Sequence, residues 1–168
     1  MKNIKFHTDR GDLHKLCESI NERESLLEIG SLAGVSTEIF SKYFKNVISI
    51  DPYIPGYDEN DINSQEYRLK EAKKIFDKRF KNSKNVIQYN FTSEQAAQKF
   101  DGYMFDVVYI DSTHTYEAVK HDIELWSNKC KYLAGHDWDW ADVNKAVKEC
   151  FNENEIEIYK PNHWIVKI

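Results

Sequence analysis

Two hydrophobic periodicities alternate along the 168 residues of this chain. Short β-branched apolar runs predict buried strands, and each run is followed by a segment whose apolar residues recur at helical spacing. The predicted strands span residues 25–29, 46–50, 85–89, 106–110 and 131–134. The predicted helices span residues 13–20, 35–44, 69–80, 93–100, 116–126 and 143–151. Such alternation indicates a parallel sheet with right-handed helical crossovers.

The C-terminal end departs from this alternation. Two strand-like runs, 156–159 and 164–166, are separated only by the segment Lys160-Pro161-Asn162-His163. This spacing predicts a β-hairpin, which would add an antiparallel edge to the sheet. The predicted fold is therefore α/β and Rossmann-like, a doubly wound and mostly parallel seven-stranded sheet with a C-terminal antiparallel hairpin.

Length and composition indicate one globular domain over residues 1–168. The chain falls within the size range of one domain, and 41% hydrophobic and 30% charged residues are typical of a packed core with a solvated surface. The net charge is −5 and the lysines are dispersed, so no nucleic-acid partner is evident.

Cysteine spacing and hydropathy suggest the setting of the protein. The three cysteines, Cys17, Cys130 and Cys150, lack the spacing of a disulfide framework or a zinc site. No apolar stretch is long enough to cross a bilayer, so no membrane partner is expected. We therefore expect a cytoplasmic protein.

Polar residues follow the predicted strands, and in doubly wound sheets ligands bind at the carboxyl ends of the strands. The turn from Gly30 to Gly34 places small residues before a helix N-terminus, where backbone amides can approach a ligand. Asp51 follows Gly30 by about 20 residues, the separation at which an acidic side chain binds ribose hydroxyls. These residues favour a nucleoside-bearing cofactor, although Gly-rich turns also serve strand–helix packing.

Three segments then indicate a family. The segment LLEIGSLAGVST resembles the first motif of class I S-adenosylmethionine (SAM)-dependent methyltransferases. The segments VVYIDSTHTYEAVKHDIELW and AGHDWDWADVNKAVKEC resemble the IDxxHxYExVxxD and GHDW signatures of a small subgroup of that class. This subgroup is related to metal-dependent O-methyltransferases that act on sugars and other small molecules. The resemblance extends from residue 26 to the closing HWIVKI.

The resemblance implies a set of cofactor contacts. Glu28, Gly30 and Ser31 would face the methionine part of SAM, with Gly34 as the second glycine of the motif. Asp51 would bind the ribose. Ser93, with its neighbours Thr92 and Glu94, would lie near the adenine, and Asp111 would also border the cofactor. Ser112 departs from the pattern because glycine is common there, and its side chain could narrow the transfer cleft.

The resemblance also implies a catalytic and a metal-binding set. Asp111, His136 and Asp137 match oxygen-ligand positions of a divalent cation, and the imidazole would favour Mn²⁺ over Mg²⁺. The same residues could instead cap helices and satisfy buried backbone groups. We expect His114 to be the general base beside Asp111, unless it only hydrogen-bonds its own loop. Tyr116 and Trp138 are candidate walls of an acceptor pocket.

The function predicted from the sequence is SAM-dependent O-methylation of a small hydroxylated acceptor such as a sugar. Assistance by Mg²⁺ or Mn²⁺ and a homo-oligomer that completes the pocket are optional parts of this hypothesis. The loop 53–63 is expected to lie over the cofactor. Two alternatives remain open: a nicotinamide-dependent oxidoreductase, which the missing GxGxxG pattern disfavours, and a noncatalytic SAM- or nucleotide-binding module.

Overall fold

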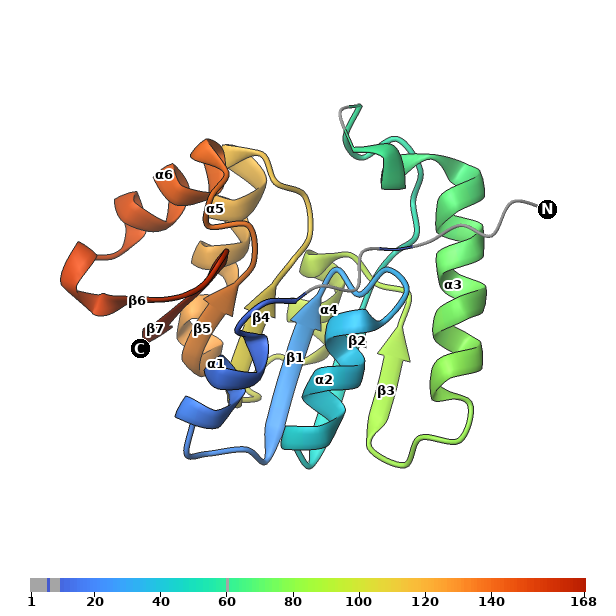
Figure 1. Ribbon diagram of the computed structural model, residues 1–168, viewed down its shortest axis with the longest axis horizontal. Helices are drawn as coiled ribbons and strands as arrows, with labels where there is room; N and C mark the ends of the chain where they lie inside the picture. The colour runs from blue at the N-terminus through green and yellow to red at the C-terminus, as the bar shows by residue number, and fades with distance from the viewer. Residues whose placement is uncertain (1–5, 7–9, 60) are drawn as a thin grey trace.

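The chain folds around one central sheet in the computed structural model, which describes residue 6, residues 10–59 and residues 61–168 (Figure 1). In this part of the chain the sheet has seven strands in the order β3-β2-β1-β4-β5-β7-β6. The strands are β1 (Ser25–Ile29), β2 (Asn46–Ile50), β3 (Val86–Tyr89), β4 (Phe105–Ile110), β5 (Cys130–Gly135), β6 (Ile156–Tyr159) and β7 (His163–Lys167). Strands β1 to β5 pair in parallel, and β7 is antiparallel to both β5 and β6.

This sheet confirms the predicted fold class, including the C-terminal antiparallel hairpin. Several boundaries differ from the sequence prediction by one to three residues, and two of these differences concern the C-terminal strands. His163 is the first residue of β7, not part of the turn, and β5 extends from Cys130 to Gly135. Both extensions follow from pairing between strands, because Tyr159 pairs with His163 and Gly135 pairs with Trp164.

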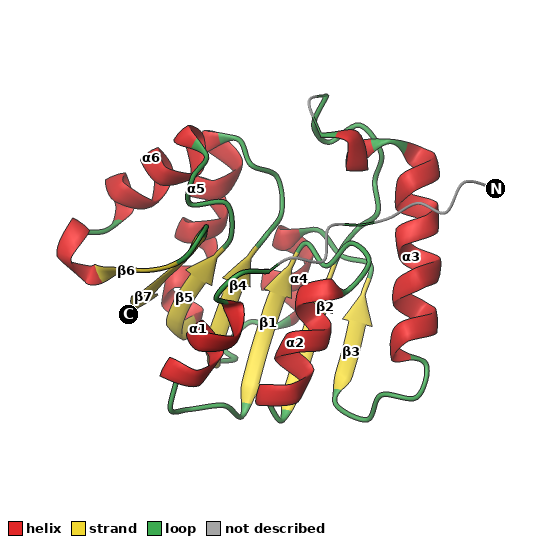
Figure 2. Cartoon of the chain, in the orientation of Figure 1, coloured by secondary structure: helices red, strands yellow, loops and turns green. Residues whose placement is uncertain are grey.

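Helices cover both faces of the sheet, and α3 lies beside the β3 edge (Figures 1 and 2). The helices are α1 (Leu13–Ser19), α2 (Val35–Tyr43), α3 (Glu66–Phe80), α4 (Ser93–Lys99), α5 (Tyr116–Trp126) and α6 (Ala141–Cys150). One buried cluster joins α1 and α2 to the sheet through residues such as Leu16, Phe40 and Val107. A second cluster joins α4, α5 and α6 to the opposite face through residues such as Ala96, Trp126 and Val147. The structure is therefore doubly wound.

The strand order places the reversal of winding between β1 and β4. From β1 the chain first adds β2 and β3 on one side, and it then crosses back to add β4 and β5 on the other side. Ile29 of β1 pairs with both Ile50 and Ile110, and Ile110 pairs with Gly135. Four strands consequently end in register, and the residues after them meet at one edge. A crevice at such a reversal is the usual ligand site of this architecture.

Gly30 allows the β1 turn to approach the end of β4. Its φ is +86°, and a Cβ at this position would lie 2.2 Å from the Asp111 carbonyl oxygen. Gly34 serves a different contact, because a Cβ there would lie 2.5 Å from Phe80 of α3. The two glycines of the motif are thus required by strand proximity and by packing between α2 and α3.

The segment before α1 is joined to the C-terminal hairpin. The Asp12 amide donates to the Lys160 carbonyl oxygen at 2.8 Å, and His163 Nε2 contacts the Arg10 carbonyl oxygen at 2.6 Å. These contacts hold Arg10 at the carboxyl end of the sheet. None of the described helices has the length and apolar character that crossing a membrane requires.

Candidate functional site

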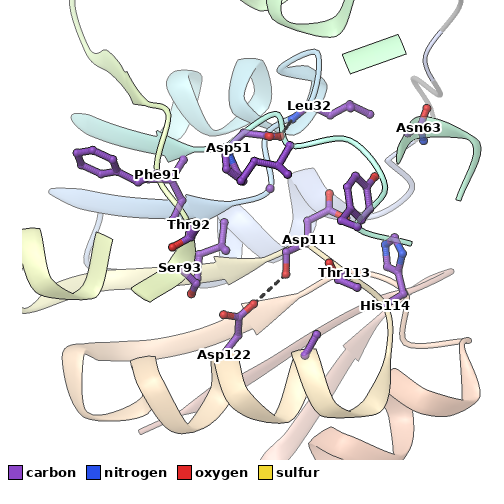
Figure 3. Close-up of a pocket in the computed structure, with 18 of the residues that line it drawn as sticks. Leu32, Asp51, Asn63, Phe91, Thr92, Ser93, Asp111, Thr113, His114 and Asp122 are labelled. Atoms are coloured by element: carbon purple, nitrogen blue, oxygen red, sulfur yellow. Dashed lines mark hydrogen bonds between the residues drawn. The ribbon is translucent and has the colours of Figure 1, made fainter. Parts of the chain in front are cut away.

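A pocket of about 380 Å³ lies at the carboxyl ends of the strands, where the winding reverses (Figure 3). Its walls come from the ends of β1, β2 and β4, from the start of α4 and from the loop after β2. Its lining includes Arg10, Gly30, Asp51, Ser93, Asp111, Ser112, His114 and Asp122. A volume of this size suits a small-molecule ligand or cofactor.

Asp51 is held rigidly in the pocket wall. Its Oδ2 accepts a hydrogen bond from the Leu32 amide and its Oδ1 accepts one from the Tyr53 amide, each at 2.8 Å. Leu32 and Tyr53 both have positive φ, so the carboxylate joins two tight turns. Burial raises the pKa of Asp51, against the opposing effect of these amides. The predicted ribose-binding side chain is therefore in the pocket and already oriented.

Glu28, predicted to face the methionine part of SAM, is not among the residues that line the pocket. The side chain is fully buried, and its carboxylate accepts hydrogen bonds from Ser36, Thr37 and Ser49. Burial raises the pKa of Glu28 to about 7 despite these donors. The residue connects β1 with the first turn of α2 and with β2, which shapes the turn above it.

Ser31 and Gly34 also lie outside the pocket lining. Ser31 is buried and its Oγ accepts a hydrogen bond from Gln88 Nε2 at 3.1 Å. Of the glycine-rich motif, Gly30 lines the pocket, together with Leu32, which the sequence had not singled out. A cofactor in this pocket would contact the glycine-rich motif at the backbone near Gly30.

The far end of the pocket is formed by residues around Ser93. Ser93 Oγ accepts a hydrogen bond from Trp126 Nε1 at 2.8 Å, and Ser112 Oγ donates to Asp122 Oδ2 at 2.8 Å. Burial raises the pKa of Asp122. Ser112 thus engages a neighbouring carboxyl group, an interaction that a glycine at this position could not make.

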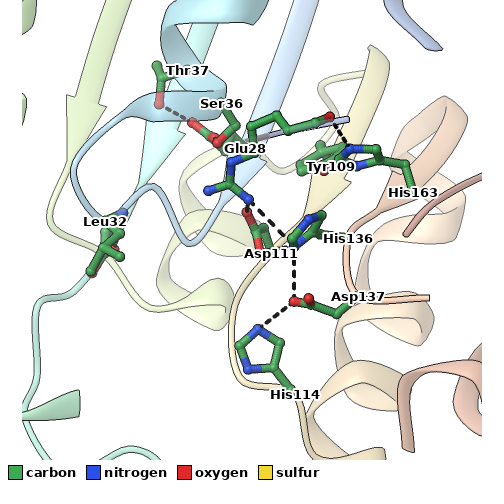
Figure 4. A network of polar contacts seen from close by, with 12 residues as sticks. Glu28, Leu32, Ser36, Thr37, Tyr109, Asp111, His114, His136, Asp137 and His163 are labelled. Atoms are coloured by element: carbon green, nitrogen blue, oxygen red, sulfur yellow. Dashed lines mark hydrogen bonds and ion pairs between the residues drawn. The ribbon is translucent and has the colours of Figure 1, made fainter. Parts of the chain in front are cut away.

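The residues predicted for catalysis and metal binding do come together, at the ends of β4 and β5 (Figure 4). His114 Nε2 lies 2.8 Å from Asp137 Oδ2. His136 Nδ1 lies 3.1 Å from the same Asp137 oxygen and 3.4 Å from Asp111 Oδ1. Ligand atoms of Asp111, His136 and Asp137 all lie within 4.8 Å of one another.

Arg10 completes this cluster, and no sequence motif had pointed to it. Its Nη1 donates to Asp111 Oδ2 at 3.0 Å and lies 3.5 Å from His136 Nδ1. The guanidinium lines the pocket and is largely buried. The Arg10 backbone is held near the site by His163 of the C-terminal hairpin, a contact between distant parts of the chain.

Mutual attraction shifts the pKa values of this cluster. Burial alone would lower the pKa of His136, but Asp111 and Asp137 raise it to about 9. Burial alone would likewise lower the pKa of His114, and the hydrogen bond to Asp137 raises it above the ordinary value. The pKa of Asp111 moves the other way, because Arg10 and His136 outweigh its burial. The two carboxyl groups are therefore ionised at neutral pH.

The aromatic ring beside His114 is Trp140, for which the sequence suggested no role. The two ring centroids are 4.8 Å apart, and about half of the Trp140 side chain is exposed. Tyr116 and Trp138, the predicted walls of an acceptor pocket, lie outside the pocket lining and pack against the core of the α5 and α6 face. The periodicity of the sequence could not distinguish these rings, because all three are close to strand ends.

The loop after β2 borders the pocket, as expected from its position. Ile54, Tyr57, Asp61 and Asn63 contribute to the lining, and the Tyr57 hydroxyl donates to Asp61 Oδ2 at 2.6 Å. Ile54 and Tyr57 remain exposed on their outer side. The loop therefore forms one rim of the pocket.

The doubly wound sheet, the pocket at its reversal point and the acidic residues after β2 and β4 are typical of proteins that bind a nucleoside-bearing cofactor. The methyltransferase-domain family matches residues 27–137, well over half of the chain. The chain belongs to this family and is a class I SAM-dependent methyltransferase, which confirms the prediction from the sequence motifs. The nicotinamide-dependent oxidoreductase alternative finds no support in this match.

Solved structures share the fold at low sequence identity. The O-methyltransferase NovP is 13% identical with a TM-score of 0.68, over 93% of this chain and 77% of that one. An O-methyltransferase from Bacillus cereus in complex with SAH is 14% identical with a TM-score of 0.60, over 93% and 79%. The N-methyltransferase NodS from Bradyrhizobium japonicum is 16% identical with a TM-score of 0.61, over 92% and 90%. No curated protein sequence matches the chain.

Proposed function

We propose that this methyltransferase transfers the methyl group of SAM to a hydroxyl oxygen of a small acceptor, with His114 as general base. A sugar hydroxyl is the first candidate acceptor. The observation that supports this proposal is the pairing of His114 with Asp137 in the pocket wall, at 2.8 Å between Nε2 and Oδ2. Relatives of this fold include both O- and N-methyltransferases, so the preference for oxygen rests on this base.

The surroundings of His114 suit proton acceptance. With Nε2–H donated to Asp137, the lone pair is on Nδ1, which is buried and has no hydrogen-bond partner among the described residues. An unpaired buried polar atom costs free energy, and a hydrogen bond from an acceptor hydroxyl would remove that cost once a movement of the imidazole or its loop exposed Nδ1. Asp137 would stabilise the imidazolium that forms when the proton moves to Nδ1.

The remaining pocket residues suit a nucleoside. Asp51 would accept hydrogen bonds from the ribose hydroxyls, because its position in the wall is fixed by two backbone amides. Ser93 and the buried Asp122 would border the adenine, and the backbone at Gly30 would approach the methionine part. When bound, SAM supplies a methyl group on a positively charged sulfur. The residues of this chain then have to align the acceptor oxygen and exclude water, which is where most of the rate enhancement arises.

A divalent cation does not fit this site while Arg10 is in place. Asp111, His136 and Asp137 are donor types that Mn²⁺ accepts, and their atoms are close enough to share one ion. However, the Arg10 guanidinium contacts the Asp111 carboxylate and lies beside His136 Nδ1. The metal-assisted form of the hypothesis would require this group to leave, so we derive no catalytic step through a metal. A homo-oligomer and a cytoplasmic location stay predictions from the sequence.

Calorimetric titration with SAM and S-adenosylhomocysteine, for wild type and Asp51→Ala, tests the cofactor site. We expect binding to wild type and a loss of at least about tenfold in the variant, since two buried hydrogen bonds to the ribose would be removed. Asp77→Ala is the control, because this exposed helix residue pairs with Lys73 and is not among the residues that line the pocket. Equal affinity of Asp51→Ala and wild type would contradict the placement of the ribose.

Turnover with radiolabelled SAM and a panel of sugars and other alcohols tests the reaction. Methylation of a hydroxyl group that is lost in His114→Gln, with SAM binding retained, would support the proposal. SAM binding without turnover on any acceptor would instead favour the noncatalytic module. Methylation of an amine in preference to a hydroxyl would contradict the choice of acceptor atom.

A further inference from the structure

The Arg10 side chain lies against groups to which a metal ion at this cluster would have to bind. Its Nη1 is 3.0 Å from Asp111 Oδ2 and 3.5 Å from His136 Nδ1, two of the three groups that could ligate a cation. A bound Mg²⁺ would lie about 2.1 Å from each ligand atom, and transition-metal ions approach carboxylate and imidazole ligands at similar distances. A divalent ion and the guanidinium would therefore compete for the same Asp111 carboxylate and repel each other.

Contacts with the C-terminal hairpin hold the backbone at Arg10 and Asp12, and so position the Arg10 guanidinium. The Arg10 carbonyl contacts His163 Nε2 at 2.6 Å, and His163 Nδ1 in turn contacts the Tyr109 hydroxyl at 2.8 Å. The next residue is Gly11, with φ of +44°, where a Cβ would lie 2.2 Å from Pro161 Cδ. The chain at Gly11 therefore packs closely against Pro161 in the β6–β7 turn, where a side chain would not fit.

The charge balance of the cluster is already satisfied without a metal. Asp111 and Asp137 are the acidic groups of the cluster, and each lies within ion-pair distance of a basic side chain. Arg10 contributes one positive charge directly to Asp111, and the imidazoles of His136 and His114 face Asp137. A divalent ion would add two further positive charges beside a guanidinium in a largely buried site, where such repulsion is strong.

We infer that the Arg10 guanidinium supplies the positive charge beside Asp111 and His136 that a divalent metal would otherwise supply. Methyl transfer by this chain is therefore independent of metal. Arg10 is a positioning residue: its contact with the Asp111 carboxylate holds that group in place at the pocket wall. The catalytic part of this inference rests on the proposed function. The part that concerns metal binding does not, because it can be measured without an acceptor or turnover.

The test compares Mn²⁺ binding by electron paramagnetic resonance and calorimetry in wild type, Arg10→Met and Arg10→Lys. Arg10→Met retains most of the apolar side chain but removes the charge, and we expect it to bind Mn²⁺ at least about tenfold more tightly than wild type. Arg10→Lys retains the charge and should stay close to wild type. Adding Asp111→Asn to Arg10→Met should abolish the gain, which would locate the ion at this cluster.

A matched control separates this effect from general loss of positive charge. Arg79→Met removes an arginine that pairs with Glu38 at 2.7 Å, at a position remote from the cluster, and should leave Mn²⁺ binding unchanged. Thermal unfolding of each variant checks that it is folded. SAM binding, measured on the same samples, reports separately on the cofactor pocket, so failure of the proposed function is distinguishable.

Two results would overturn the inference. In the first, wild type binds Mn²⁺ as tightly as Arg10→Met, which would mean that the guanidinium does not exclude the ion. In the second, Arg10→Met gains no affinity although it is folded, which would mean that these three side chains do not form a cation position. Where an acceptor is known, loss of wild-type turnover in EDTA and recovery with Mn²⁺ would also contradict metal independence.

Discussion

At the scale of single residues, the two nitrogens of His114 differ in their surroundings. Nε2 is paired with Asp137, whereas Nδ1 is buried without a partner among the described residues. A base must be neutral to accept a proton, and the pKa of His114 is raised by Asp137. The rate should therefore increase with pH as His114 loses its proton, and Asp137 should determine where that increase falls.

We expect Asp137→Asn to lower kcat and to move the acidic limb of the pH–rate profile to lower pH. The amide cannot stabilise the imidazolium, so the His114 pKa falls and the base is weaker. A loss of about 100-fold or more is typical when general-base catalysis is impaired. The measurement is kcat against pH for wild type and variant, with SAM affinity as the control. An unchanged profile position would show that His114 is not the titrating base.

Glu28 is a buried carboxyl group whose contribution to stability depends on pH. Its pKa is raised from 4.5 to about 7, mainly by burial. The folded state therefore binds the proton more tightly than the unfolded state, and this stabilisation is fully present below about pH 4.5 and is lost as pH rises through 7. The residue acts on the fold and on the shape of the β1 turn.

Between pH 5 and 8 the free energy of unfolding of wild type should fall as Glu28 ionises. We expect it to fall less in Glu28→Gln, by on the order of 1–3 kcal/mol. Glutamine has a similar shape and cannot ionise. Urea unfolding at several pH values provides the measurement, and Glu24→Gln, which removes an exposed carboxylate, is the control. A parallel pH dependence in Glu28→Gln and wild type would mean that Glu28 titrates normally.

At the scale of the elements, the close approach of the β1 turn to the end of β4 aligns the pocket. Gly30 and Gly102 both have positive φ, +86° and +73°, but only Gly30 has neighbours where a Cβ would be. Comparison of the two positions separates the cost of the backbone conformation from the cost of the close contact.

We expect Gly102→Ala to cost about 1 kcal/mol of stability, which is the usual cost of strain at positive φ. Gly30→Ala should cost clearly more, because its Cβ would collide with the Asp111 carbonyl 2.2 Å away, and it should also weaken SAM binding. Chemical denaturation and calorimetry measure the two effects. Equal losses in both variants would indicate that the β1 and β4 ends are not closely packed.

At the scale of the whole molecule, His163 joins three parts of the chain. It belongs to β7, its Nδ1 contacts Tyr109 of β4, and its Nε2 contacts the Arg10 carbonyl before α1. Burial is the main cause that lowers the pKa of His163 from 6.5 to about 4. The neutral imidazole is the stabilising form, so its contribution is present above about pH 6.5 and is lost as pH falls through 4.

We expect His163→Gln to be less stable than wild type at pH 7 and to show a smaller loss of stability between pH 6.5 and 4. The amide can replace one of the two hydrogen bonds but does not titrate, and the difference should be on the order of 1–3 kcal/mol. Unfolding free energies over this pH range test it, with His14→Gln as an exposed control. The sign is opposite to that of Glu28, so the two variants should change the pH dependence in opposite directions.

The sequence by itself determined the order of strands and helices and the residues at the strand ends. Periodicity is a local property, and it predicted the parallel sheet, the hairpin and the location of Asp51, Asp111, His136 and Asp137. It could not show that Glu28 and Gly34 contact neighbouring elements of the fold, because a turn that packs and a turn that binds a cofactor contain the same residue types.

Only the tertiary structure decided which side chains share the site. Arg10 has no motif around it and reaches Asp111 through a contact with His163, more than a hundred residues away in the chain. Trp140, not Trp138, lies against His114 because of the backbone path after β5. Contacts of this kind depend on how the hairpin and the segment before α1 pack together, and no local pattern in the sequence records that packing.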